Sequence, residues 1–187
     1  MAKVFSALDE TMRDFIARQH LFFVASATAD SRINLSPRSA RDFRVLGDNT
    51  VCWIDLTGSG NETAAHLRAD GRLTVMFCAF EGAPNILRLY GQGEVLHRKN
   101  TAFADIVAKS YEGRTPAGTR QIVRLTADRV QTSCGYAVPV FNYQRERPGL
   151  DNWAASKDEA GMEAYWQEKN VLSIDGLPTG LFEEAEA

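Results

Sequence analysis

The sequence contains few cysteines and no long apolar run. Cys52, Cys78 and Cys134 are widely spaced, and two of them lie in apolar stretches, so we expect reduced thiols in a reducing cytoplasm rather than a disulfide framework. No apolar stretch approaches membrane-spanning length, and the acidic residues soon after Lys3 are untypical of a secretory signal. These absences favour a cytoplasmic protein without a membrane segment.

An excess of positive charge is also lacking. The 187 residues include 21 Lys and Arg against 24 Asp and Glu, which gives a formal net charge of −3. Such a balance argues against a surface built for bulk binding to nucleic acid or to an anionic membrane. The length and the 44% share of hydrophobic residues indicate a globular domain with one core, alone or with a terminal extension.

Several familiar catalytic and metal-binding motifs are missing. His20, His66 and His97 stand far apart, without a pair at helical ligand spacing, so we expect no metal site. Gly58-Ser-Gly60 lacks a third glycine at the dinucleotide spacing, because Thr63 stands there, and the chain has no P-loop lysine or Gly-x-Ser-x-Gly motif. The sequence therefore assigns no catalytic residue.

The most informative stretch joins a predicted strand to a predicted helix. Residues 51–56 are rich in β-branched and aromatic side chains, four small or polar residues follow, and Asn61 opens a run that can be helical as far as Gly71. A helix start presents free backbone N–H groups at its positive dipole end, and Ser59, Asn61 and Thr63 add side-chain donors. This pattern fits a phosphate site. An ordinary helix start with Asn61 as N-cap fits the same residues.

Arginines before and after this stretch are candidates to pair with the anion. Arg38, Arg41 and Arg44 follow one another in a short connection, either as a cationic cluster or as solvated loop charges. Arg88 shares a strand face with Tyr90, an arrangement that directs its guanidinium to a buried anion or exposes that face at an edge.

The rest of the pattern predicts a mainly β fold with peripheral helices. Strands joined by short turns indicate an antiparallel sheet, and residues 72–80 are apolar on both faces, as in a sheet that closes into a barrel. The predicted strands cover 21–28, 33–36, 51–56, 72–80, 85–96 with a glycine bulge, 120–125, 130–133 and 137–141. The predicted helices cover 7–19 with Ser6 as N-cap, 61–71, 100–110 and 151–170.

A shift in composition divides the chain into two parts. Residues 1–141 form the predicted barrel domain, and residues 142–187 form a C-terminal extension with one helix and an irregular tail. The helix carries Trp153 and Trp166, enough apolar surface to pack on the barrel or on a dimer partner.

The combination of motifs resembles a known family. The order Phe22-Phe-Val-Ala-Ser-Ala, Asn34-Leu-Ser-Pro-Arg38, residues 51–67 and Ile86-Leu-Arg-Leu-Tyr-Gly91 is similar to the pyridoxamine 5′-phosphate oxidase-like family of flavin-binding split barrels. The resemblance covers roughly residues 5–140. The stretch from Ser133 to Pro139 is closer to a branch of that family other than the oxidase itself.

The resemblance implies an antiparallel split β-barrel that forms a homodimer, with one FMN per protomer in a groove at the subunit interface. It also implies which residues hold the cofactor. By their match to the family, the cofactor-binding residues are Ser36, Arg38, Ser59, Asn61, Thr63 and Arg88.

One position departs from the oxidase. The oxidase carries a Ser-Arg-Lys run at the helix start, whereas this chain has Asn61-Glu-Thr63, so two cations are replaced by an acid and a hydroxyl. The phosphate would then depend on Arg38, with Arg41 as a further candidate, on backbone donors and on Thr63.

The function implied by the resemblance is that of an FMN-dependent oxidoreductase acting on a small molecule. The alternative is a non-catalytic binding module that holds haem, deazaflavin or flavin as a carrier or sensor. Trp53, Tyr90 and Tyr136 are aromatic candidates for the flavin ring and equally candidates for plain core packing. Cys134 is expected either near the flavin or as an inert buried thiol.

Overall fold

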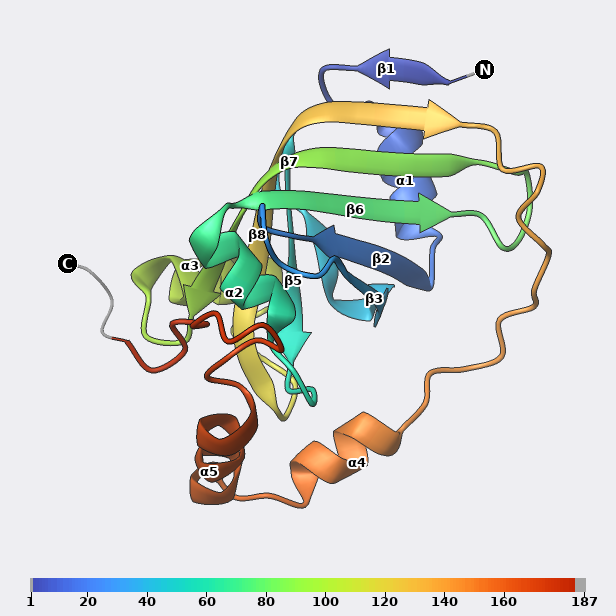
Figure 1. The fold of residues 1–187 in the computed structure, drawn as a ribbon. Coiled ribbons are helices and arrows are strands. Elements are labelled where there is room, and N and C mark those ends of the chain that lie inside the picture. The colour runs from blue at the N-terminus through green and yellow to red at the C-terminus, as the bar shows by residue number, and fades with distance from the viewer. Residues whose placement is uncertain (1, 184–187) are drawn as a thin grey trace.

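The computed structural model describes residues 2–183, so residues 184–187 of the expected extension lie outside it. Eight strands form one antiparallel sheet in the order β3-β2-β6-β7-β8-β5-β4, with β1 paired to β8 (Figure 1). The strands are β1 (Lys3–Phe5), β2 (Leu21–Ser26), β3 (Asn34–Ser39), β4 (Phe43–Val45), β5 (Thr50–Leu56), β6 (Arg72–Cys78), β7 (Ile86–His97) and β8 (Thr119–Ser133). The helices are α1 (Glu10–Ala17), α2 (Glu62–Ala69), α3 (Thr101–Ser110), α4 (Gly149–Ala155) and α5 (Glu159–Lys169), with a 3₁₀ turn at Ala40–Asp42.

Two long strands connect the halves of the barrel. β7 and β8 pair along their whole length, with a register shift at Tyr90 and Gly91 where both strands bend. A β-carbon at Gly91 would lie 2.1 Å from the carbonyl oxygen of Thr126, so only glycine allows β8 to pass this closely. The glycine bulge predicted in this strand is confirmed. β3 and β4 are the two ends of this strand order, and β1 forms a third free edge beside β8.

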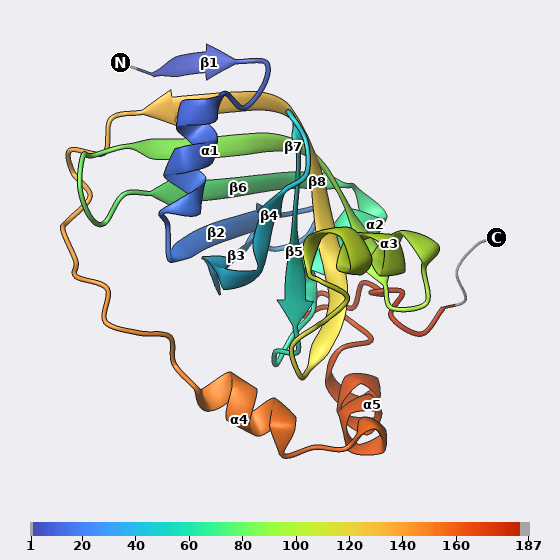
Figure 2. The same cartoon turned by 180° about the vertical axis from the view of Figure 1, so that it is seen from behind.

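An aromatic cluster fills the barrel interior. Phe22 is fully buried and packs edge-on against Trp53, with ring centroids 5.3 Å apart, and against Phe43 at 4.9 Å. Burying side chains of this size contributes about 1.5–3 kcal/mol each. Helix α1 closes one end of this core with Met12, Phe15 and Ile16, and it lies behind the sheet in Figure 1 and in front of it in Figure 2.

The opposite face of the β1-β8-β7-β6-β2-β3 half carries no helix (Figure 1). In register, Phe23 lies opposite Met76, and Met76 lies opposite Arg88, so these three side chains share that outer face. Val4 on β1 and Leu35 on β3 extend the apolar surface at its two ends, 59% and 65% exposed.

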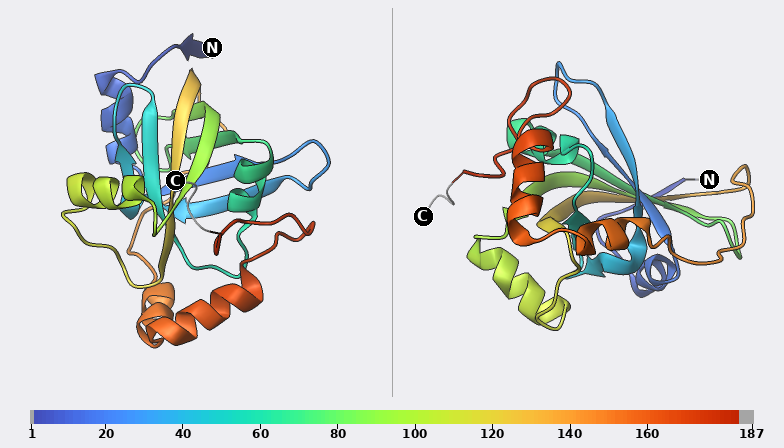
Figure 3. Two further views of the ribbon diagram at one scale, coloured as in Figure 1. Left: turned by 90° about the vertical axis from the view of Figure 1, so that its left-hand side faces the viewer. Right: turned by 90° about the horizontal axis from the view of Figure 1, so that it is seen from below.

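The C-terminal extension leaves the barrel and returns to it. After β8 the connecting segment 134–148 runs along the outside to α4 and α5, which lie together below the barrel (Figure 3). Trp166 of α5 is buried and donates from Nε1 to Thr57 Oγ1 at 2.8 Å, which fixes the helix to the loop after β5. The division into domains 1–141 and 142–187 stays a prediction.

The elements differ from the expected ones in several places. The N-cap of α1 is Asp9 and not Ser6, because the Asp9 carboxylate accepts from Met12 N at 2.8 Å. The two strands expected at 120–125 and 130–133 are one strand, β8, since the intervening polar residues lie on its exposed side. The helix expected over 151–170 is broken, because Asp158 caps a new helix by accepting from Gly161 N.

Two short strands were not expected, and one expected strand is absent. β1 and β4 have three residues each, too few to show periodicity. Residues 137–141, expected as a strand, lie in the irregular connecting segment. None of the helices within residues 2–183 has the length and apolar character needed to cross a membrane.

Candidate functional site

An ion pair between Arg38 and Asp55 joins β3 to β5. Arg38 on β3 lies opposite Phe22 in register and therefore faces the barrel interior, where its Nη2 lies 3.1 Å from Asp55 Oδ1 on β5. Asp55 is buried and Arg38 is half-buried. The β3 connection and the strand before the predicted phosphate loop thus meet at one place.

A second arginine holds the other side of the same carboxylate. Arg120 Nη2 donates to Asp55 Oδ2 at 2.7 Å, and Gln121 Nε2 donates to the same oxygen at 2.9 Å. Burial alone would raise the pKa of Asp55, but the charges of Arg120 and Arg38 outweigh it and lower that pKa below its ordinary value. Asp55 therefore stays ionised, and two cations share one carboxylate.

Asn61 begins α2 but does not offer its side chain to a ligand. It is the N-cap residue by position, yet its side chain makes no capping hydrogen bond. Its Oδ1 accepts from Gln121 Nε2 at 2.8 Å, and its Nδ2 donates to the carbonyl oxygen of Asn170 at 3.4 Å. The amide group that was expected to donate to a phosphate is thus bonded within the chain.

Thr63 connects the helix start to β3. Asn34 Nδ2 donates to Thr63 Oγ1 at 3.1 Å and to Ser26 Oγ at 3.3 Å, and Ser26 Oγ lies 3.1 Å from His66 Nδ1. Ser36 Oγ donates to Asn34 Oδ1 at 2.9 Å. Ser36 and Thr63 therefore belong to one hydrogen-bonded network, and Arg38 and Asn61 belong to a second one through Asp55 and Gln121. The two networks meet at the start of α2, and we call them together the polar cluster.

Two of the predicted site residues, Ser59 and Arg88, do not belong to the polar cluster. Ser59 is exposed in the loop between β5 and α2. Arg88 lies on the uncovered outer face of the sheet, where its Nη1 donates to Ser133 Oγ at 3.1 Å. Within one chain Arg88 and Arg38 face opposite sides of the sheet, so one protomer does not bring them into a common groove.

The C-terminal tail closes over the loop that was expected to bind phosphate. Asn170 is fully buried, accepts from Arg120 Nη1 at 2.7 Å through its Oδ1 and donates to the Gly58 carbonyl at 3.2 Å. The Glu62 carboxylate accepts from the backbone N–H of Ile174 at 3.0 Å. The tail therefore packs on its own barrel, one of the placements expected for it.

Sequence reasoning missed three members of this cluster. Arg120 and Gln121 open an apolar strand, and a charged residue at the start of such a run was the only available signal. Asn170 gave no signal, because its role depends on a tail that returns across the barrel from 50 residues beyond Arg120. Asp55 lies near the end of the buried strand β5, a place where an acidic side chain is unusual.

The other candidate residues are separate from the cluster. Arg41 forms an ion pair with Asp151 of α4, with Nη2 and Oδ1 2.6 Å apart, and the Arg44 guanidinium stacks 4.5 Å above the Tyr111 ring. Trp53 is core, and Tyr136 is 84% exposed on the connecting segment. The three arginines of the connection therefore do not form one cationic site.

The remaining candidates also lie outside the cluster. Tyr90 donates from its hydroxyl to Gln131 Oε1 at 3.1 Å on the outer face. Cys134 is exposed, so it is not a buried thiol. Within residues 2–183 no three His, Cys, Asp or Glu side chains gather as they would around a metal ion.

The chain is similar to known proteins in both sequence and fold. Residues 8–134 match the family described as Pyridoxamine 5'-phosphate oxidase. The pyridoxamine 5′-phosphate oxidase family protein ustO of Aspergillus flavus is 37% identical over 190 aligned residues, which cover 93% of this chain and 76% of ustO.

Solved structures share the fold. HupZ of Group A Streptococcus superposes with a TM-score of 0.54 at 22% identity, over 66% of this chain and 91% of HupZ. HutZ of Vibrio cholerae, described as a heme storage protein, gives a TM-score of 0.50 at 14% identity, over 69% of this chain and 97% of HutZ. The antiparallel split barrel with peripheral helices is confirmed.

Proposed function

The chain belongs to the pyridoxamine 5′-phosphate oxidase family, and from this premise we infer that it binds FMN and acts as an oxidoreductase on a small molecule. The phosphate of FMN would be held where β3 meets the start of α2. The observation that carries the proposal is the state of Arg38, whose Nε is buried without a hydrogen-bond partner in the described chain. A buried guanidinium N–H without a partner is costly, and a phosphate oxygen would satisfy it.

The local charge also suits an anion. Arg38 and Arg120 carry two positive charges against the single negative charge of Asp55, to which both are paired. Glu62 adds a negative charge at the helix start, and its carboxylate accepts from Ile174 N of the C-terminal tail. The backbone N–H groups of the first turn of α2 and the hydroxyl of Thr63 would complete the set of donors. Asn61 takes no part, because its side chain is engaged by Gln121 and Asn170.

The proposed assembly is a homodimer that uses the uncovered outer face. Phe23 and Met76, with Val4 and Leu35 toward the edges, form an apolar sheet surface that no helix of the described chain covers (Figure 1). A second copy would bury this surface and bring the Arg88 of one protomer near the flavin of the other. A reducing compartment such as the cytoplasm suits the three free cysteines.

The chemistry would be that of the cofactor. Flavin supplies hydride or electron transfer when bound, and the protein's part is to hold the phosphate, orient the ring and exclude water. No side chain of this chain is assigned as acid or base.

The test compares FMN with riboflavin, which lacks the phosphate. We expect Arg38→Gln to weaken FMN binding about tenfold to a hundredfold, the range for one charge-assisted hydrogen bond, and to leave riboflavin binding unchanged. Arg114→Gln, in an exposed loop, is the control and should alter neither. Equal loss for FMN and riboflavin, or no loss for either, would refute the phosphate assignment.

The spectrum of the purified protein separates the two function classes. An FMN oxidoreductase shows flavin bands that bleach when reduced nicotinamide or another donor is added. A haem carrier shows a Soret band instead. Protein that is colourless and gains neither cofactor on incubation would overturn the proposal.

A further inference from the structure

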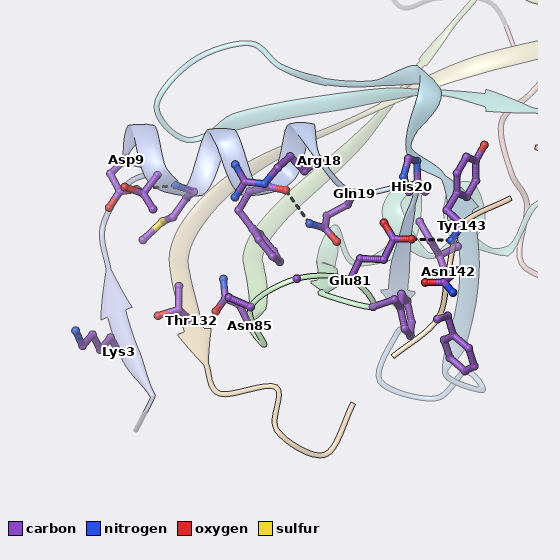
Figure 4. A pocket seen from close by; sticks show the side chains of 18 of the residues that line it. Lys3, Asp9, Arg18, Gln19, His20, Glu81, Asn85, Thr132, Asn142 and Tyr143 are labelled. Carbon is purple, nitrogen blue, oxygen red and sulfur yellow. Dashed lines mark hydrogen bonds between the residues drawn. The ribbon is translucent and has the colours of Figure 1, made fainter. Parts of the chain in front are cut away.

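A cavity of about 790 Å³ opens at the end of the sheet away from α2 (Figure 4). It lies between α1, β1, the turn that joins β6 to β7, and residues 141–143 of the connecting segment. Figure 1 shows that this turn and α2 are at opposite ends of β6. The volume is in the range of pockets that take small organic ligands, and the cavity shares no residue with the Asp55 cluster.

Part of the cavity lining is apolar and aromatic. Met12 and Phe15 of α1 are buried, and Phe80 and Phe141 pack against each other with ring centroids 5.4 Å apart. The aromatic side chains offer flat surfaces on which another ring can stack. The shape and chemistry therefore suit a flat aromatic ligand.

One wall is a stacked pair from two distant parts of the chain. The imidazole of His20 and the phenol ring of Tyr143 lie parallel, with centroids 3.7 Å apart and an interplanar angle of 8° (Figure 4). Tyr143 is held there by its backbone N–H, which donates to Glu81 Oε1 at 2.6 Å. The connecting segment, exposed along most of its length, is thus anchored at the cavity.

The charged side chains at the cavity differ in whether they already have hydrogen-bond partners. The Asp9 carboxylate caps α1, and the Glu81 carboxylate accepts from Tyr143 N. Lys3 and Arg18 line the cavity and form no hydrogen bond or ion pair through their side chains with residues 2–183. Lys3 and Arg18 are therefore free to pair with an anionic ligand.

From these contacts we propose that the cavity is a binding site for a flat aromatic carboxylate. Its ring lies against Phe15 and the stacked His20–Tyr143 pair, and its carboxylate pairs with Arg18. The site is separate from the proposed flavin phosphate site, and binding does not depend on flavin.

The test uses 2-naphthoate and, as an uncharged probe of the same ring, 2-naphthalenemethanol, each titrated into the full chain by calorimetry. We expect naphthoate to bind about tenfold more tightly, and Arg18→Gln to abolish that difference, as for the loss of one charge-assisted hydrogen bond. Lys109→Gln, an exposed lysine on α3, is the matched control and should change nothing. The proposal is wrong if naphthoate does not bind, if both probes bind equally, or if the two variants behave alike.

A second pair of variants tests the aromatic wall. Tyr143→Ala should weaken both probes by a similar factor, about three- to tenfold, while Tyr143→Phe keeps the ring and should restore binding. Because Tyr143 is 43% exposed, neither variant should change the melting temperature by much. If the alanine variant binds both probes as tightly as the wild type does, Tyr143 is not part of the binding site. Saturation with FMN should leave naphthoate binding intact, and competition between the two would show that the cavity is no separate site.

Discussion

Arg120 Nη2 lies 2.7 Å from Asp55 Oδ2, and each side chain is only 1% exposed. The same guanidinium donates through Nη1 to the Gly60 carbonyl at 3.0 Å and to Asn170 Oδ1 at 2.7 Å. One side chain therefore connects the end of β5, the loop before α2 and the returning C-terminal tail.

Replacing Arg120 should destabilise the fold strongly. Arg120→Met keeps most of the apolar volume but leaves the buried charge of Asp55 with Arg38 alone, and removal of one partner from a buried pair costs about 3–5 kcal/mol. Arg124→Ala breaks the exposed pair with Glu94, for which we expect less than about 1 kcal/mol. Urea denaturation measures both. Similar losses for the two variants would contradict the central role of Arg120.

The stability of the protein should fall in acid because of Asp55. Its pKa is lowered in the folded state, so its contribution is fully present above the unfolded pKa of about 3.9 and is lost as pH falls through the folded value. At neutral pH Asp55→Asn should be less stable than the wild type, because the buried Arg120 and the half-buried Arg38 lose their partner. The difference in unfolding free energy should shrink below about pH 4. A difference that is constant down to pH 2 would show that Asp55 does not titrate in this way.

Gly91 should tolerate no side chain. The alanine β-carbon would lie 2.8 Å from Ala127 Cα as well as against the Thr126 carbonyl, so Gly91→Ala forces β7 and β8 apart and should cost about 1–3 kcal/mol or more. Gly47 is the control, because a β-carbon there meets nothing within 4 Å and its φ is not positive. We expect Gly47→Ala to change stability by no more than about 1 kcal/mol, in the stabilising direction. Thermal unfolding of both variants decides the point.

The thiols should react unequally. Cys134 is exposed, whereas Cys52 and Cys78 are buried, and burial raises the pKa of both buried thiols. A disulfide reagent such as DTNB should modify one thiol rapidly in the folded protein and three after denaturation. Cys134→Ser should remove the fast phase. Rapid reaction at a second thiol would show that β5 or β6 opens readily.

Much of the fold follows from periodicity and turn residues. Alternation of apolar side chains predicts β2, β5, β6 and β7, and the glycine at residue 91 predicts the bend. The wrong predictions have physical causes. β1 and β4 are too short to show a periodic pattern. β8 is continuous, but the polar residues on its exposed side have the composition of a turn. The helix break at Asp158 was visible only as a second capping residue.

The candidate site was predictable only in part. Arg38 and the start of α2 could be paired through the family resemblance, and the structure does bring them together through Asp55. The engagement of Asn61 by Gln121 and Asn170 could not be foreseen, because it depends on contacts across 60 and 109 residues of sequence. The sequence pattern assigns Arg88 to one face of its strand. It does not show whether that face points into the barrel or outward.

The position of β8 has a consequence for how the chain is made. This strand pairs with β1, β5 and β7, yet within residues 2–183 it is the last strand to be synthesised. A nascent chain that ends before residue 119 has no partner for β1 or for most of β5, so the barrel cannot close until β8 is made. β2, β3, β6 and β7 can pair with one another before then, but β1 and the edges of β5 and β7 that face β8 stay unpaired. Production in cells should therefore respond to chaperones that shield such segments until translation passes β8.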